Sequence, residues 1–375
     1  MKTKLYLAIL SATACSFSAY SANIYDNHES KLDIFGDITA MVCNDRAARA
    51  LTSVKEKGNH DNTLHTAVNF GISGKTIINE HADAVAFSEW MMPTDSNGFD
   101  EFKTKGQYVG IDGHQYGILT LGRGDNAFYT ITGVTDVYNQ LNTYAHDHYV
   151  WGDYQQGLFM YALSAMGFDL RISYQTAVDD VSDSNVDLKN GAAIALATTT
   201  SSGIGIAYGI SYYDLKKKDV TDGSAFYTDN LIKMYHRSDK DYAFANALQP
   251  SFKIDRGFSI TYGNFGDGLY LALNGTQTKY DNFTNHLYAL ETIANYHFEN
   301  GFSATIGYSL KRFADTNLLS DLTFGTYYQV MPTFNVFLEG AVDLGGHAKK
   351  FYSIKQIENM SYNENKVIVG AQYLY

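Results

Sequence analysis

The chain has 375 residues, of which 45% are hydrophobic, with 32 glycines, 30 tyrosines and only 3 prolines. Its 28 basic and 40 acidic residues give a formal net charge of −12, which argues against general nucleic-acid binding because that function needs a basic surface. The many tyrosines suit strands that lie at a boundary between water and an apolar phase.

The N-terminus predicts an export signal. Two lysines precede the apolar run "LYLAILSATA", and small residues at Ala19 and Ser21 favour cleavage after Ser21, with cleavage after Ala22 as the alternative. We therefore expect a signal peptide over 1–21 and one domain over 22–375. The mature chain would keep a single cysteine, Cys43, and so would form no internal disulfide.

From residue 31 onward, apolar and polar residues alternate with a period of two. The pattern is clear in "KLDIFGDITAMVC", "GFDLRISYQT", "GFSATIGYSLK" and "FNVFLEGAVD". These segments run about ten residues, which is the length of a tilted membrane strand. We predict sixteen strands over 31–43, 62–75, 82–92, 104–112, 117–123, 149–163, 167–177, 190–199, 203–214, 257–265, 268–280, 286–298, 302–312, 319–330, 334–343 and 364–375.

The connections distinguish a membrane barrel from a soluble sandwich, whose strands alternate in the same way. Tight turns such as "SAMG", "ENG" and "MPT" alternate with long polar loops, as short periplasmic turns and long external loops do in transmembrane barrels. The uncharged stretch 191–213 is interrupted by "TTTSSG", which predicts two strands and a turn rather than a membrane helix. An extra hairpin within 216–256 would raise the strand count to eighteen.

The chain ends on "VIVGAQYLY", a strand with one apolar face and Tyr375 as its last residue. A closed barrel leaves no unpaired strand edge in lipid, so this strand is expected to close the barrel against the first one. The fold class is therefore all-β, an antiparallel transmembrane barrel.

Three motifs carry a family resemblance that spans residues 22–375. "ANIYDNHESKLDIFGD", "GRGDNAFYTITGVTD" and "VIVGAQYLY" resemble the mature start, the entry into the third loop and the closing strand of Gram-negative general diffusion porins. The resemblance implies a homotrimeric outer-membrane porin that passes small hydrophilic solutes without chemistry or cofactors. It implies sixteen strands, an inward-folded third loop that narrows the pore, contact with outer-membrane lipids, and recognition of the C-terminal strand by the barrel-assembly machinery.

In that family, acids on the third loop face basic residues on the opposite wall. Asp136 matches the "TD" of the loop, whereas Gln140 stands where a glutamate is usual, and Glu89 matches an acid of the lumen. The basic wall departs from the family at four positions: Asp37 where lysine is common, Asn69 where arginine is common, Lys105 for an arginine, and Asp153 or Tyr154 for another arginine. Arg123 remains basic and Arg171 is expected to point inward. Because acids in a pore concentrate cations, we expect a cation-preferring channel.

Ala82, Ala84, Ala86 and Ser88 form a small-residue face on the third predicted strand. Small side chains let backbones approach closely, which predicts a subunit contact, with a thin lipid-facing strip as the alternative.

Two other functions stay open. A sugar-selective porin would use aromatic side chains near the constriction, for which Tyr138, Tyr144, Tyr149, Trp151 and Tyr154 are candidates. A barrel enzyme is the third interpretation, although G-x-S-x-G, HExxH and CxxC are absent. His146 and His148 have no third ligand at a suitable spacing, so we predict no metal site.

Overall fold

The computed structural model describes residues 21–44, 64–93, 103–141, 145, 155–179, 187–216, 251–281, 285–348 and 363–375. Except for Ser21, the predicted export signal lies outside the described residues, as do Asp153 and Tyr154. Among the described residues, no helix combines the length and the apolar character that crossing a membrane requires.

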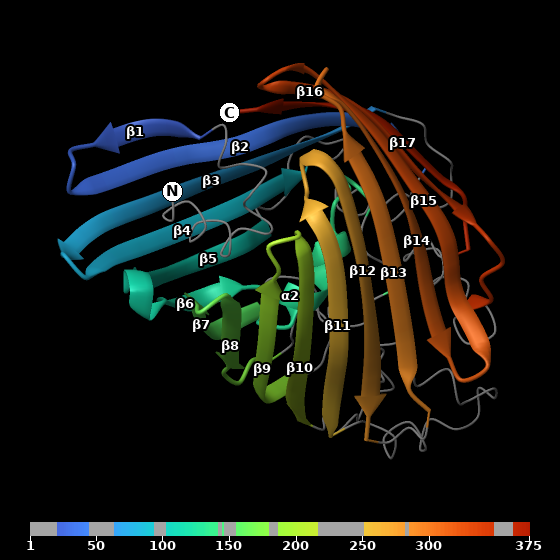
Figure 1. The fold of residues 1–375 in the computed structure, drawn as a ribbon, viewed down its shortest axis with the longest axis horizontal. Helices are drawn as coiled ribbons and strands as arrows, with labels where there is room; N and C mark the ends of the chain where they lie inside the picture. The colour runs from blue at the N-terminus through green and yellow to red at the C-terminus, as the bar shows by residue number, and fades with distance from the viewer. Residues whose placement is uncertain are drawn as a thin grey trace.

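Strands make up most of the described chain, with three short helical turns (Figure 1). The strands are β1 (Ala22–Asp26), β2 (Ser30–Cys43), β3 (Leu64–Asn79), β4 (Ala82–Pro93), β5 (Lys103–Asp112), β6 (Ile118–Gly124), β7 (Gln155–Ala165), β8 (Phe168–Gln175), β9 (Asp187–Thr199), β10 (Ile204–Lys216), β11 (Phe252–Asn264), β12 (Asp267–Tyr280), β13 (Leu287–His297), β14 (Phe302–Phe313), β15 (Thr316–Met331), β16 (Phe334–Asp343) and β17 (Lys366–Leu374). The helical turns are η1 (His114–Tyr116), α2 (Tyr129–Thr132) and η2 (Gly133–Thr135).

Sixteen of these strands, β2 to β17, form one closed antiparallel barrel. Each strand pairs with the next along the chain, and β17 returns to pair with β2 over Asp37–Cys43. The predicted count of sixteen is confirmed, and the uncharged stretch 191–213 is the β9–β10 hairpin, as predicted. Residues 217–250, where an extra hairpin was considered, lie outside the described residues.

Strand β2 has two partners along one edge. β1, which the sequence pattern did not predict, pairs with its first part, where Ala22 faces Ile34. β17 pairs with its second part, and Tyr375 exchanges two backbone hydrogen bonds with Gly36, at 2.9 and 3.0 Å. The two described ends of the chain therefore lie one after the other along β2, and they complete the seam of the barrel.

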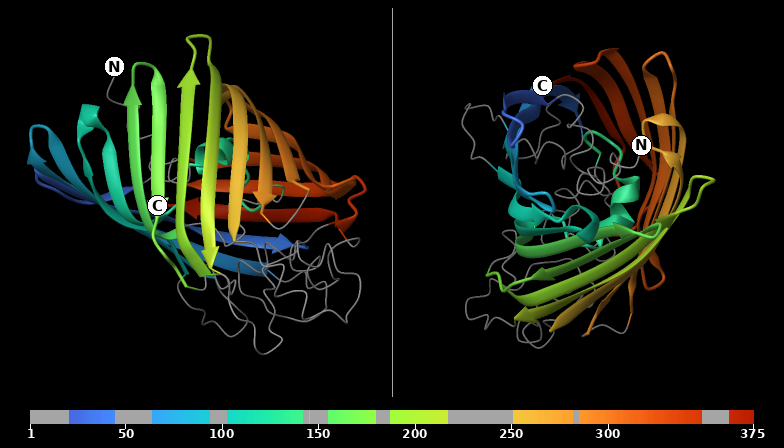
Figure 2. Two further views of the ribbon diagram at one scale, coloured as in Figure 1. Left: turned by 90° about the horizontal axis from the view of Figure 1, so that it is seen from below. Right: turned by 60° about the vertical axis from the view of Figure 1, so that its left-hand side comes forward.

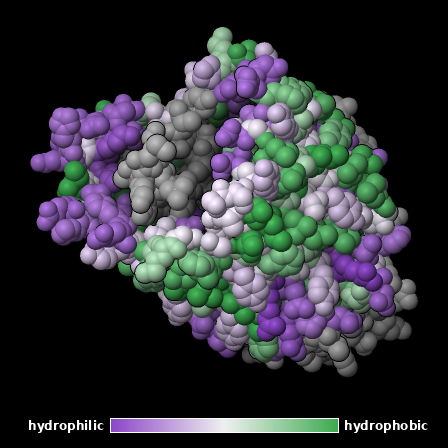
Figure 3. Space-filling model, viewed as in Figure 1, coloured by the Kyte–Doolittle hydropathy of each residue, from purple (hydrophilic) through white to green (hydrophobic). Residues whose placement is uncertain are grey.

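The two faces of the strands differ as the alternation predicts. Ile38, Ile306 and Val369 are 47%, 53% and 52% exposed on the outer face, whereas Asp37 and Glu339 on the inner face are fully buried. Figure 3 shows hydrophobic side chains spread over the strands on the right of the view and hydrophilic ones on the projecting hairpin ends on the left. An apolar outside and a polar inside are the arrangement of a transmembrane barrel.

Short turns gather at one end of the barrel. The β7–β8 turn uses Met166 and Gly167, both with positive φ (55° and 82°), which matches the twist of a tight hairpin. One short turn lies at the opposite end, where Ala314 and Asp315 join β14 to β15. The predicted connection at 313–318 was too long, because Ala314 adopts φ 50° and reverses the chain within two residues.

Candidate functional site

The third loop, residues 125–154, connects β6 to β7 and is described over 125–141 and at 145. Its helical turn α2 lies inside the ring of strands, as the right-hand view of Figure 2 shows. The loop therefore folds into the barrel rather than over its rim.

An apolar contact fixes the first part of the loop to the inner wall. Phe128 and Ile131 are fully buried against small residues of β9 and β10, among them Ala193 and Ala207. At Gly257 on β11 a Cβ atom would lie 3.0 Å from both Phe128 and Ile131, so the absence of a side chain there lets α2 lie close to the wall. Strands β7 to β11 thus hold a small hydrophobic core inside the barrel.

Polar contacts fix the middle of the loop to β12 and β13. The Thr135 hydroxyl donates to Oε2 of Glu291 at 2.6 Å, and Nδ2 of Asn274 donates to the Thr135 hydroxyl at 2.7 Å. The Tyr270 hydroxyl donates to the carbonyl of Val134 at 2.8 Å. These groups are largely buried, so each bond removes a polar atom that would otherwise be unsatisfied.

Glu339 on β16 holds the tip of the loop. Its Oε1 accepts the backbone N–H of Asn139 at 2.6 Å, and its Oε2 accepts those of Gln140 and Leu141 at 3.0 and 2.9 Å. The Tyr327 hydroxyl donates to Oε1 at 2.7 Å. One buried carboxylate therefore binds three successive amides, and charge-assisted bonds of this kind are about twice as strong as neutral ones.

On the loop itself, Asp136 is exposed, and its Oδ2 accepts the Tyr129 hydroxyl at 2.8 Å. Gln140 is half-buried, and its backbone belongs to the Glu339 contact. Tyr138, one of the aromatic candidates for sugar binding, donates its hydroxyl to Thr323 at 2.8 Å and packs against the wall. The other four aromatic candidates, and His146 and His148, lie outside the described residues.

Strands β2 to β6 carry the remaining predicted pore residues on their inner face. Asp37 is fully buried, and it accepts Nδ2 of Asn69 at 2.8 Å and Nε2 of Gln372 at 3.2 Å. Glu89 is also buried and forms an ion pair with Lys105 at 3.3 Å, whose side chain is 25% exposed.

Arg123, near the root of the loop, donates its Nε to the carbonyls of Thr104 and Lys105 at 3.0 and 3.1 Å. Arg171 shares the inner face of β8 with buried Ser173. The charged side chains on β2 to β6 are thus held by an ion pair, by side-chain amides or by backbone carbonyls. Spacing in the sequence could not reveal these contacts.

An aromatic row on the same wall was not predicted. The ring centroids of Phe35 and Phe87 lie 5.4 Å apart, and those of Phe87 and Tyr108 lie 5.1 Å apart, all nearly parallel. Gly71 on β3 makes the row possible, because a Cβ atom there would overlap the Phe35 ring.

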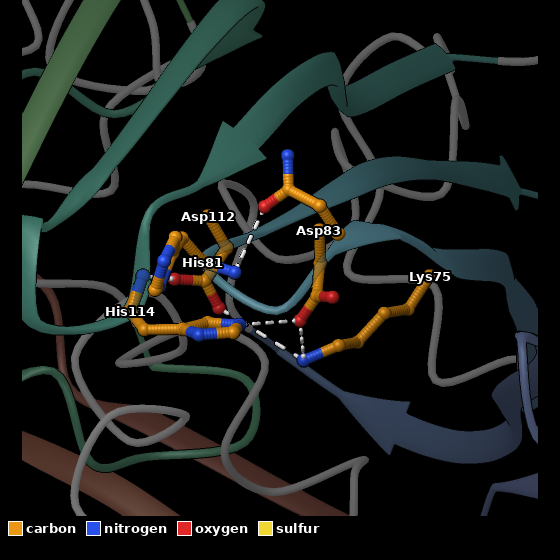
Figure 4. Close-up of polar contacts among 6 residues, drawn as sticks. Lys75, His81, Asp83, Asp112 and His114 are labelled. Atoms are coloured by element: carbon orange, nitrogen blue, oxygen red, sulfur yellow. Dashed lines mark hydrogen bonds and ion pairs between the residues drawn. The ribbon is translucent and has the colours of Figure 1, made fainter.

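A second polar cluster lies at the short-turn end of β3 to β6 (Figure 4). Asp83 contacts Nζ of Lys75 at 2.6 Å and Nε2 of His114 at 2.8 Å. Asp112 lies 4.0 Å from Lys75 and accepts the backbone N–H of His114 at 2.9 Å. This cluster joins the β3–β4 hairpin to the β5–β6 turn. Within the described residues, no group of three or more His, Cys, Asp or Glu side chains could hold a metal ion.

The small-residue face lies on the outside of the barrel. Ala84 faces Ile111 and Ala86 faces Val109 on β5, and these two larger neighbours are 52% and 60% exposed. Ser88 is buried and accepts Nε2 of Gln107 at 3.2 Å, while Ala82 begins the strand. Ala84 and Ala86 line a groove of ≈ 520 Å³ that runs across the outer face of β1 to β6. This part of the outer surface is hollowed rather than convex.

No family model matches the chain. Among curated proteins, outer membrane protein F of Serratia marcescens is 21% identical over 376 residues, which cover 92% of this chain and 93% of the relative. Among solved structures, Salmonella typhi OmpF in complex with daunomycin matches with a TM-score of 0.70 at 17% identity, covering 94% of this chain and 100% of that one. The trimer form of in-vitro folded OmpT from Vibrio cholerae matches with a TM-score of 0.60 at 11% identity, covering 92% and 100%.

Proposed function

We propose that this chain, a member of the general diffusion porin family that forms a channel in the outer membrane, passes small hydrophilic solutes and prefers cations. The family is one of channels and not of enzymes, so transport needs no chemistry on the solute. The third loop narrows the lumen, and the charges around it bias which ions enter.

The observation that carries the preference for cations is the balance of charge around the third loop. On the wall of β2 to β6, the acids Asp37 and Glu89 offset the bases Lys105 and Arg123. The loop side adds exposed Asp136 together with its two buried anchoring acids, Glu291 and Glu339. Asp136 is the exposed acid of this set, and a carboxylate beside a narrow aqueous path raises the local concentration of cations.

Asp37 is expected to act through its field rather than by touching ions, because its side chain is sealed under Asn69 and Gln372. Asp136 is the acid that meets permeating ions directly. The reversal potential across a KCl gradient in planar bilayers tests the proposal. A potential that reports preference for chloride would contradict it, and a folded, inserted protein without conductance would contradict the channel itself.

We also propose that the chain assembles as a homotrimer, with the face that contains Ala82, Ala84, Ala86 and Ser88 at the subunit contact. The groove over β1 to β6 supports this proposal, because exposed Val109 and Ile111 beside small residues offer a surface for close packing. Two remaining parts of the proposal come from sequence: removal of residues 1–21 on export, and recognition of the C-terminal strand by the barrel-assembly machinery.

A further inference from the structure

The tip of the third loop ends in an apolar seat on the barrel wall. Leu141 is 2% exposed and packs with Met41 and Cys43 of β2, Phe337 of β16 and Ile368 of β17. These three strands are the ones that meet where the barrel closes. Tyr138 of the same loop also packs against this cluster, whereas Phe128 and Ile131 pack on β7 to β11.

The seat is assembled by strand register. Cys43, Ile368 and Glu339 face one another in a row across β2, β17 and β16, and Met41, Gly370 and Phe337 form the next row. Glu339 thus stands beside Ile368 and binds the amides of the same loop tip. A shift of one residue in the pairing of β17 would turn Ile368 to the outer face and so remove its part of the seat.

Two glycines complete this arrangement. At Gly370 a Cβ atom would lie 2.5 Å from the Phe337 ring, so this ring can extend over β17 only because the side chain is absent. At Gly325 a Cβ atom would lie 2.6 Å from the Tyr327 hydroxyl, which crosses this position to reach Glu339. The apolar part of the seat therefore depends on a glycine of β17, and the polar part depends on a glycine of β15. These two strands flank β16.

We propose that Leu141 is a positioning residue that latches the third loop onto the closing seam, so that the width of the pore depends on correct pairing of β17 with β2. The part of this statement that concerns pore width rests on the proposed channel function. The latch itself is a packing arrangement that holds whether or not the channel conducts. Only a barrel closed in the native register offers the complete seat, and a seated Leu141 holds the tip of the loop against the wall beside Glu339.

Cys43 provides a natural reporter, because it is 1% exposed beneath Leu141 and is the only cysteine after residue 21. The experiment measures the rate at which a maleimide labels Cys43 in the full mature barrel, with folding verified by heat-modifiable migration. We expect slow labelling of the natural protein. Leu141→Ala removes the side chain over the thiol and should accelerate labelling about tenfold or more.

Gly370→Ala should also accelerate labelling of Cys43, because the added methyl group displaces Phe337. This variant leaves the sequence of the loop unchanged. Ile131→Ala is the matched control, since it deletes a buried side chain of the same loop away from the seam and should leave labelling slow. Equal labelling of Leu141→Ala and the natural protein would overturn the latch, as would equal acceleration by Ile131→Ala.

Single-channel conductance supplies the second readout. Leu141→Ala should conduct more than the natural protein, because an unlatched tip no longer narrows the lumen. If labelling follows the expected pattern but conductance is unchanged, the link to pore width is wrong and the latch stands. If no variant conducts, the channel proposal fails, and the labelling result still decides the latch.

Discussion

Replacing Glu339 by glutamine tests whether one carboxylate holds the tip of the third loop. The carboxylate accepts four hydrogen bonds between 2.6 and 3.0 Å, three from backbone amides and one from Tyr327. Glutamine keeps the shape but replaces one acceptor oxygen with an NH₂ group, so two of the four donors lose their acceptor. A buried donor without a partner costs about 1–3 kcal/mol, so docking of the loop tip should weaken by about 2–6 kcal/mol.

The assay is single-channel recording, combined with heat-modifiable migration to verify that the barrel has folded. The β2–β17 barrel does not depend on the loop for its own pairing, so Glu339→Gln should fold and insert. We expect a larger and noisier conductance, because a tip released part of the time no longer narrows the pore steadily. Glu291→Gln is the matched control at the middle of the same loop, where the carboxylate accepts the Thr135 hydroxyl and the Ala145 amide at 2.6 and 3.3 Å.

We expect Glu291→Gln to change the conductance less than Glu339→Gln, since apolar packing and Tyr270 also hold that part of the loop. A quiet channel of natural conductance in Glu339→Gln would refute the assignment of the tip to this carboxylate. An effect of Glu291→Gln as large as that of Glu339→Gln would show that the loop is held as one unit rather than by separate anchors.

Three further outcomes are expected. Asp136→Asn should keep the bond from Tyr129 but lower the preference for potassium over chloride about two- to fivefold, measured as reversal potential, because a unit charge close to the ion path in water is worth about 1 kcal/mol before screening. Ala84→Leu combined with Ala86→Leu should lower the temperature at which the proposed homotrimer dissociates in mild detergent, since bulk prevents close approach; an unchanged temperature would place both residues against lipid. Deleting Tyr375 removes two backbone bonds at the seam, each worth about 0.5–1.5 kcal/mol, and should reduce the yield of heat-resistant barrel, whereas an unchanged yield would show that the seam does not need them.

The strands could be predicted from the sequence because lipid and water impose a period of two on each of them. The same periodicity, together with the family resemblance, predicts Asp37 and Glu89 on the inner face. It could not show that both acids are buried, because their partners Asn69, Gln372 and Lys105 come from other strands. Burial of this kind is decided by register between strands, which alternation within a strand does not specify.

β1 and the β14–β15 turn were missed for local reasons. β1 has only five residues and both of its faces are exposed, so it carries no alternation to detect. The β14–β15 turn depends on Ala314 at φ 50°, a conformation that alanine seldom adopts. An alanine in the sequence therefore does not predict a turn at this position.

The anchors of the third loop were beyond the reach of sequence spacing. Glu339 lies buried on the inner face of β16, but nothing in its strand indicated that a loop about two hundred residues earlier would bind it. When a polar side chain binds the backbone of a distant loop, no particular residue type in that loop marks the contact. Spacing in the sequence therefore cannot identify it. The resemblance placed the loop in the barrel, and only the structure supplied the contacts that hold it.

Because of the hydrophobic core inside the barrel, different parts of the inner wall tolerate different substitutions. Where α2 packs on β7 to β11, inner positions such as Ala193, Ala207 and Gly257 are constrained by volume, and a larger side chain there would displace the loop. On β3 to β6 the inner residues include the ion pair of Glu89 and Lys105 and two rings of the aromatic row, and they lie outside the core around α2. Substitutions of the charged side chains on these four strands should therefore change which solutes pass, while the anchors of the third loop on the other strands stay in place. Laboratory evolution of permeability should be most productive on that quarter of the wall.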